Sequence, residues 1–255
     1  MMAHLSKTIM NNDDLQLVED GAPAYLLMID SLISKDPDNK KTLATAALLY
    51  SAYADVYVKD EDRAGKMSAK ALQYAGKSVC LSKQNACGLK DMTYDAFQKA
   101  LLLLEKDDLY ALFAFGQSWG TWIMANQSDP DAIADLSRIE AIMRRVIELD
   151  ETFKQGAPFI YLGTLCSFLP PALGGRPDEG KAHFETAIQM SNGKNLSAKL
   201  AYAKFYARNI FDRELHDRLL KEVISADPYV DGHTLINIWI QKQARQLLDE
   251  ADDFF

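Results

Sequence analysis

Residues 157–190 read APFIYLGTLCSFLPPALGGRPDEGKAHFETAIQM, two segments of helical periodicity around a break rich in proline and glycine. Gly163 lies midway along the first segment, and Gly180 lies early in the second, with Phe184 and Ala187 following it. A glycine costs a helix interior about 1 kcal/mol relative to alanine. We therefore interpret both glycines as points where two antiparallel helices cross closely, because the close contact offsets that cost.

The same placement of a small residue before an aromatic one recurs along the chain. It is found at Ala47 with Tyr50 followed by Ala64 and Ala71, at Gly116 with Trp119, and at Ala203 with Tyr206. One such match is weak, but matches in a common register indicate a repeated helix pair.

The predicted helix ends are regularly spaced in the second half of the chain. They fall near Asp36, Asp150, Met190 and Asp227, and the last three are separated by roughly 36–43 residues, close to the tetratricopeptide (TPR) period. Two antiparallel helices cannot bury their apolar faces alone, so such units must stack. We predict an all-α fold, a TPR-like solenoid or bundle of antiparallel pairs with about 10–12 helices.

This pattern predicts one TPR-like helical domain over residues 1–255. Its repeat-like units are expected at approximately 39–75, 107–150, 154–190 and 194–227, with a terminal helix at 230–251.

Composition excludes some classes of function. Hydrophobic residues make up 48% of the chain, enough for a continuous core. The net charge is −8 and no basic stripe is present, which argues against nucleic-acid binding. No apolar run approaches the roughly 18–20 residues of a membrane-spanning helix.

Catalytic motifs were sought and none was found. The sequence has no phosphate-binding glycine loop, no His-Glu-x-x-His and no Gly-x-Ser-x-Gly. The histidines are scattered, and the cluster around His216 consists of consecutive residues that point around a helix instead of converging. We therefore predict no catalytic, metal or cofactor-binding residues and no enzymatic activity.

Aromatic residues gather in the helices expected to come first in each unit, which line the concave face of a TPR array. Most of them are expected to fill the core between helices. Some are expected to wall an apolar ligand cavity, with the Pro170–Pro177 segment at its rim. The candidates for the cavity are Phe115, Trp119, Trp122, Tyr161, Phe168, Tyr202 and Tyr206.

The three cysteines are too few for a disulfide framework and lack zinc-site spacing. Cys166 is interpreted as a small buried apolar residue. Cys80 and Cys87 lie across a stretch that reads as a helix end and loop. Two free thiols and a short-loop disulfide formed in an oxidising compartment both remain open for this pair.

Several segments together resemble a known family. They are residues 20–27 (DGAPAYLL), 36–39 (DPDN), 49–54 (LYSAYA), 111–113 (ALF), 118–120 (SWG), 169–176 (LPPALGGR), 180–188 (GKAHFETAI), 211–220 (FDRELHDRLL) and 251–254 (ADDF). From about Asp13 to its end, the chain resembles the TPR-containing T component of tripartite ATP-independent periplasmic (TRAP) transporters, often called TatT.

The resemblance implies a periplasmic lipoprotein with a TPR-like helical fold that assembles as a trimer. It implies a partner, the periplasmic solute-binding protein of a TRAP system, and a ligand that is expected to be a small hydrophobic molecule. It implies no catalytic residues and no cofactors.

The start of the chain departs from the family pattern, because a signal sequence and a lipid-bearing cysteine are missing before Leu5. Either a start codon has replaced them ahead of the mature domain, or the gene product is cytoplasmic. We expect the first.

The leading hypothesis is a non-enzymatic periplasmic scaffold that binds the solute-binding protein and a small apolar ligand. One alternative is a peptide-binding TPR co-chaperone or adaptor, which usually carries Lys, Asn and Arg on its concave face. Another is a helical metal-dependent hydrolase that uses the His216 region.

Overall fold

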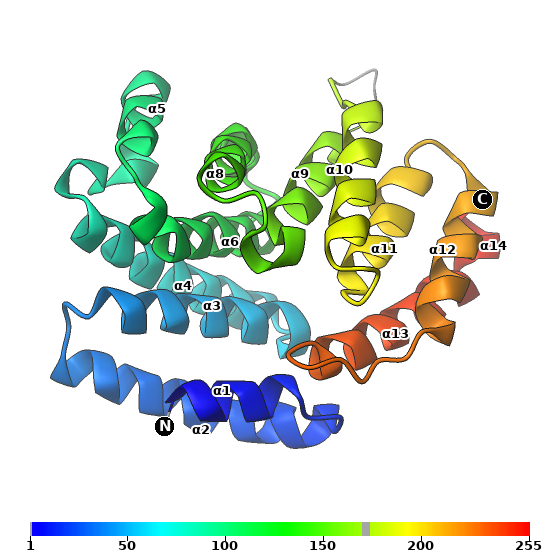
Figure 1. Ribbon diagram of the computed structural model, residues 1–255, viewed down its shortest axis with the longest axis horizontal. Coiled ribbons are helices and arrows are strands. Elements are labelled where there is room, and N and C mark those ends of the chain that lie inside the picture. Colours follow the sequence, from blue (N-terminus) through cyan, green and yellow to red (C-terminus); the bar gives the residue numbers. More distant parts are fainter. Residues whose placement is uncertain (1, 170–173) are drawn as a thin grey trace. The chain divides into compact units, whose positions relative to one another are not determined.

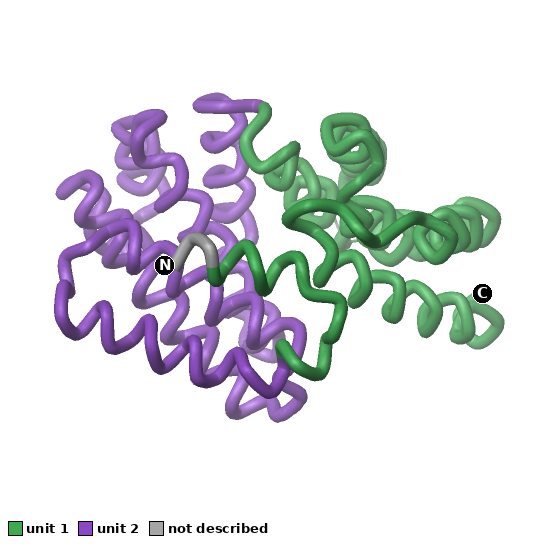
Figure 2. The backbone as a smooth tube through the Cα atoms, turned by 60° about the horizontal axis from the view of Figure 1, so that its bottom comes forward, with its two compact units in different colours: residues 1–18, 152–255 green, residues 19–151 purple. Residues whose placement is uncertain are grey.

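The computed structural model describes residues 2–169 and 174–255, and within these residues the chain folds into helices without strands (Figure 1). The predicted all-α fold is confirmed. The helices group into two compact units, residues 19–151 and residues 1–18 with 152–255, which we call the 19–151 unit and the terminal unit (Figure 2). The stacking of repeats, and the grouping of residues 1–255 into one domain, stay predictions.

The 19–151 unit begins within a long helix whose first turn belongs to the terminal unit. Its elements are α2 (Leu15–Lys35), α3 (Lys40–Tyr57), α4 (Glu61–Ser82), the 3-10 turns η1 (Gln84–Ala86) and η2 (Leu89–Asp91), α5 (Tyr94–Leu102), η3 (Lys106–Asp108), α6 (Leu109–Ala125), α7 (Pro130–Ala134) and α8 (Leu136–Leu149).

A partly buried carboxylate links the first three of these helices. Asp30 of α2 accepts hydrogen bonds from the Tyr50 hydroxyl at 2.7 Å, the Tyr74 hydroxyl at 2.9 Å and the Lys70 ammonium. Partial burial alone would raise the pKa of Asp30, but these donors outweigh it and hold that pKa below its usual value. The carboxylate therefore stays charged and joins α2 to α3 and α4.

Helix α6 packs closely on α8 at Gly116. A Cβ atom at this position would lie 2.7 Å from both Ile142 and Met143, so only glycine fits without movement of its neighbours. Trp119, one turn further, is completely buried and packs edge-on against Phe97. The expected close approach at Gly116 therefore lies between α6 and α8.

The terminal unit combines the N-terminal helix with the second half of the chain. Its elements are α1 (Met2–Met10), the 3-10 turn η4 (Phe153–Gly156), α9 (Ala157–Phe168), α10 (Pro177–Met190), α11 (Ser197–Ala201), the π-helix η6 (Tyr202–Ala207), α12 (Arg213–Ser225), α13 (Thr234–Asp249) and α14 (Ala251–Phe254).

The two glycines of the 157–190 stretch do lie at one helix crossing. A Cβ at Gly163 of α9 would stand 2.8 Å from the Phe184 ring of α10. A Cβ at Gly180 of α10 would in turn lie 3.1 Å from the Gly163 carbonyl oxygen and would overlap the Ser167 hydroxyl. The close packing of α9 on α10 therefore requires that neither Gly163 nor Gly180 carries a side chain.

Phe184 also belongs to the main apolar core of the terminal unit. This core gathers buried side chains from α10 to α13: Phe184, Leu196, Leu200, Tyr202, Ala203, Tyr206, Ala207, Leu219, Leu220, Val223, Ile240 and Ala244. None of the described helices is both long and apolar enough to cross a membrane.

Candidate functional site

An apolar pocket of about 390 Å³ opens within the 19–151 unit. Small-molecule sites usually occupy about 300–1,000 Å³ and are lined mainly by apolar side chains. Helix α4, the segment from η1 to η2 and helix α6 supply the walls. The lining residues are Ala69, Leu72, Gln73, Gly76, Lys77, Val79, Ala86, Gly88, Leu89, Lys90, Asp91, Phe115 and Trp122.

Two residues of the α4 wall, Ala69 and Gly76, are small and leave room in the pocket. Gly76 faces α6, where a Cβ would be in ordinary van der Waals contact with the Phe115 ring at 3.7 Å. Ala69 lies two turns earlier on the same helix and also lines the pocket. Larger side chains at these positions would occupy the space that a ligand needs.

A disulfide closes the second wall. Cys80 in the last turn of α4 is bonded to Cys87, with their Cα atoms 4.2 Å apart. Gly88 follows with a φ of 73°, a left-handed conformation that favours glycine, and turns the chain into η2. The bridge therefore ties the η1–η2 segment to the end of α4.

The far end of that segment is tied to α8. The Arg138 guanidinium donates to the carbonyl of Leu89 at 3.4 Å and to that of Met92 at 2.7 Å. Because the disulfide holds one end of the segment and Arg138 holds the other, this wall of the pocket has a defined position.

The third wall carries the aromatic rings. Phe115 and Trp122 lie two helical turns apart on α6, and both line the pocket. The Lys90 ammonium lies 4.0 Å from the centre of the Trp122 ring, a cation–π contact that covers one face of the indole. Lys77 of α4 also lines the pocket and pairs with Asp38 at 3.1 Å. The pocket thus joins an aromatic wall to cationic groups.

The family model of the TRAP transporter T-component matches residues 11–255. The chain belongs to this family. The expected resemblance is confirmed, and the T-component is therefore an accessory component of a transport system. No curated protein matches the chain.

The structure distributes the seven predicted cavity residues of the T-component between its two units. Phe115 and Trp122 line the pocket, whereas Trp119 is 0% exposed and lies in the core of the same unit. Tyr202 and Tyr206 are buried in the core of the terminal unit. Tyr161 and Phe168 lie partly exposed on α9. The expected rim, Pro170–Pro177, includes residues 170–173, which lie outside the described residues.

The His216 region does not form the site that a hydrolase would need. His216 is completely buried, its Nδ1 lies 2.9 Å from Asp217 Oδ1, and its Nε2 accepts from the Arg208 Nε–H at 3.4 Å. The Phe255 ring packs against the imidazole. Both ring nitrogens therefore have protein partners, Asp217 at Nδ1 and Arg208 at Nε2.

The carboxyl group of Asp55, in α3, has a raised pKa. The Thr121 hydroxyl of α6 donates to its carboxylate at 3.0 Å. Desolvation by surrounding protein raises the pKa of Asp55 to about 6, and the hydrogen bond from Thr121 opposes that rise. Asp55 is exposed at the surface, so the shift comes from the protein atoms crowded around its carboxylate, and water screens part of it.

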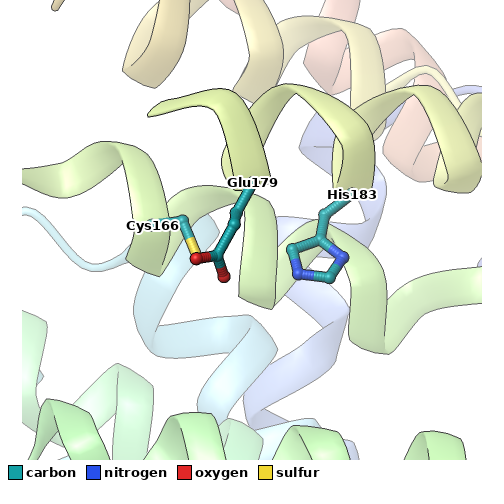
Figure 3. Close-up of side chains that lie close together, drawn as sticks. All are labelled: Cys166, Glu179 and His183. Atoms are coloured by element: carbon teal, nitrogen blue, oxygen red, sulfur yellow. The ribbon is translucent and has the colours of Figure 1, made fainter. Parts of the chain in front are cut away.

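Sequence reasoning missed one group of side chains in the terminal unit. Cys166 of α9 and Glu179 and His183 of α10 point toward one another, and their ligand atoms all lie within 4.8 Å of one another (Figure 3). Glu179 and His183 are one helical turn apart, a spacing that places two ligands on the same face of a helix. That spacing could have been noticed. The approach of Cys166 depends on the helix crossing and could not.

Proposed function

We propose that this T-component is a non-enzymatic periplasmic scaffold that binds the solute-binding protein of a TRAP system and holds a small apolar ligand. The family match over residues 11–255 carries the proposal for the transport system. The pocket between α4, α6 and the disulfide-closed segment supports the proposal for the ligand.

The pocket favours a ligand that is apolar along most of its length and carries a negative group at one end. Leu72, Phe115 and Trp122 offer apolar contact, and the charged residues of the lining are Lys77, Lys90 and Asp91. A ligand anion would compete with Asp38 for Lys77, so the apolar contacts must provide most of the binding free energy.

Filling the pocket tests this assignment. We expect Gly76→Leu to weaken binding of the apolar fluorescent probe 8-anilinonaphthalene-1-sulfonate at least tenfold, because the new side chain projects from α4 toward Phe115. The variant should remain folded, since replacing a helix glycine gains about 0.5–1 kcal/mol of helix propensity. Fluorescence titration measures the affinity.

Gly65→Leu is the matched control. Gly65 lies on the same helix, does not line the pocket, and would place its Cβ where no atom lies within 4 Å. This variant should bind the probe as the parent protein does. Equal affinity of the Gly76→Leu variant and the parent would show that the probe binds elsewhere and would remove the pocket from the proposal.

The remaining parts of the proposal rest on the family. We infer a lipid anchor on the native protein and a homo-oligomer, a trimer by resemblance. Sedimentation equilibrium should then return a mass above that of the 28.5 kDa chain at high concentration. A monomer throughout would refute the oligomer and leave the pocket proposal unchanged.

A further inference from the structure

The group formed by Cys166, Glu179 and His183 has a structural origin in the crossing of α9 and α10. The crossing is close because Gly163 and Gly180 carry no side chains. The Arg176 backbone N–H donates to the Cys166 carbonyl at 2.8 Å and holds the start of α10 against the end of α9. The thiol is thereby placed beside the first turns of α10.

The three side chains offer one sulfur, one nitrogen and one oxygen donor. Zn–S and Zn–N or Zn–O bonds of about 2.0–2.3 Å in a tetrahedron bring ligand atoms about 3.3–3.8 Å apart. The three ligand atoms lie within 4.8 Å of one another, so zinc binding requires them to close in by at most about 1.5 Å. Glu179 is exposed and its long side chain can supply that movement, whereas Cys166 is buried.

We propose that Cys166, Glu179 and His183 bind a zinc ion, with the fourth coordination position taken by water. Zinc accepts thiolate, imidazole and carboxylate together, whereas magnesium and calcium require oxygen ligands. Because the ligands come from α9 and α10, the ion cross-links the two helices. No catalytic role follows from this position.

Two neighbouring side chains contact the proposed ligands. The Arg176 guanidinium lies 3.3 Å from the Glu179 carboxylate, and this exposed ion pair leaves the carboxylate able to move toward an ion. The Phe159 ring packs beside the His183 imidazole, with ring centres 5.8 Å apart, and limits its rotation.

Zinc titration of the chelator-treated protein tests the proposal. We expect one zinc per chain by isothermal titration calorimetry, together with a higher melting temperature, because an ion that binds only the folded state stabilises it. Cys166→Ser, Glu179→Gln and His183→Gln should each weaken binding at least about tenfold. Glu185→Gln on the same helix and His233→Gln in the same unit serve as controls and should bind zinc as the parent does.

Cobalt provides an independent measurement. The Co²⁺ form should show a thiolate-to-cobalt absorption band that is lost in Cys166→Ser and kept in Glu185→Gln. Glu179→Gln changes an exposed side chain and should remain folded, so it keeps the test valid if a Cys166 variant does not fold. No zinc binding, or binding that Cys166→Ser and Glu179→Gln both leave unchanged, would overturn the proposal.

Discussion

The crossing of α9 and α10 shows how one missing side chain shapes the terminal unit. A Cβ at Gly163 would lie 2.8–2.9 Å from three atoms of the Phe184 ring, and Phe184 is itself completely buried in the core. The ring cannot move away without displacing Tyr202, which stacks on it at 5.3 Å between ring centres. Gly163 is therefore a packing requirement and not a flexible point.

Gly163→Leu should lower the free energy of unfolding by about 1–3 kcal/mol or more, because the larger side chain overpacks the crossing. Urea unfolding followed by circular dichroism measures the loss. Gly65→Leu, in open space on α4, should cost little by comparison. An unchanged midpoint for Gly163→Leu would mean that this crossing is wrongly placed.

A second prediction concerns Asp55 and the dependence of folding stability on pH. The pKa of Asp55 is raised from 3.8 to about 6. As pH rises through this range, the Asp55 carboxyl therefore loses its proton at a lower pH in the unfolded chain than in the folded protein. Stability contributed by this group is therefore lost as pH rises through that window. Asp55→Asn should be more stable than the parent near neutral pH, and the difference should vanish near pH 4.

Denaturant unfolding at several pH values from about 4 to 8 measures this difference. Thr121→Val removes the hydrogen bond that lowers the pKa of Asp55, and it should shift the pH window upward. If Asp55→Asn increased the free energy of unfolding by the same amount at every pH, the raised pKa of Asp55 would be contradicted.

The η1–η2 segment is the element whose position matters most to the proposed ligand site. It follows α4, carries Ala86, Gly88 and Leu89 into the pocket lining, and is closed by the Cys80–Cys87 bridge. A bridge over so short a loop stabilises a fold by about 2–3 kcal/mol through the entropy of the unfolded chain.

Cys80→Ala with Cys87→Ala should therefore lower the free energy of unfolding by about 2–3 kcal/mol and weaken probe binding. Reduced parent protein should behave like this double variant. Thiol titration of the unfolded, unreduced parent should find one reactive thiol, that of Cys166. Three reactive thiols would show that no bridge forms.

Helices could be predicted from the sequence because their starts and ends depend on nearby residues. Asn39 and Asp212 accept from backbone N–H groups of the helices that follow them, and α8 and α10 end at Leu149 and Met190, where the pattern placed their ends. The helix crossing at Gly163 and Gly180 could also be predicted. A glycine in a helix interior costs about 1 kcal/mol relative to alanine, and a close contact between two helices can offset that cost.

The side-chain environments could not be predicted in the same way. Trp119 and Trp122 are three residues apart, so they lie only about 60° apart around α6. Helical periodicity cannot separate them, yet one is completely buried and the other lines the pocket. The difference comes from what packs against α6, and the Cys166, Glu179 and His183 group escaped prediction for the same reason.

At the scale of the whole molecule, the function that we propose is the binding of a partner protein. The family match covers both compact units, so both belong to the transport component. The net charge of −8 and the lack of a basic stripe favour a protein partner over nucleic acid. The proposed partner is the solute-binding protein of the same TRAP system.

Isothermal titration of the purified T-component with that solute-binding protein tests the central claim most directly. We predict a saturable complex with a Kd of about 1 μM or tighter, as expected for a specific protein interface. A solute-binding protein from an unrelated transporter class should give no complex and serves as the control. Absence of any complex with the TRAP protein at concentrations near about 100 μM would contradict the proposed function.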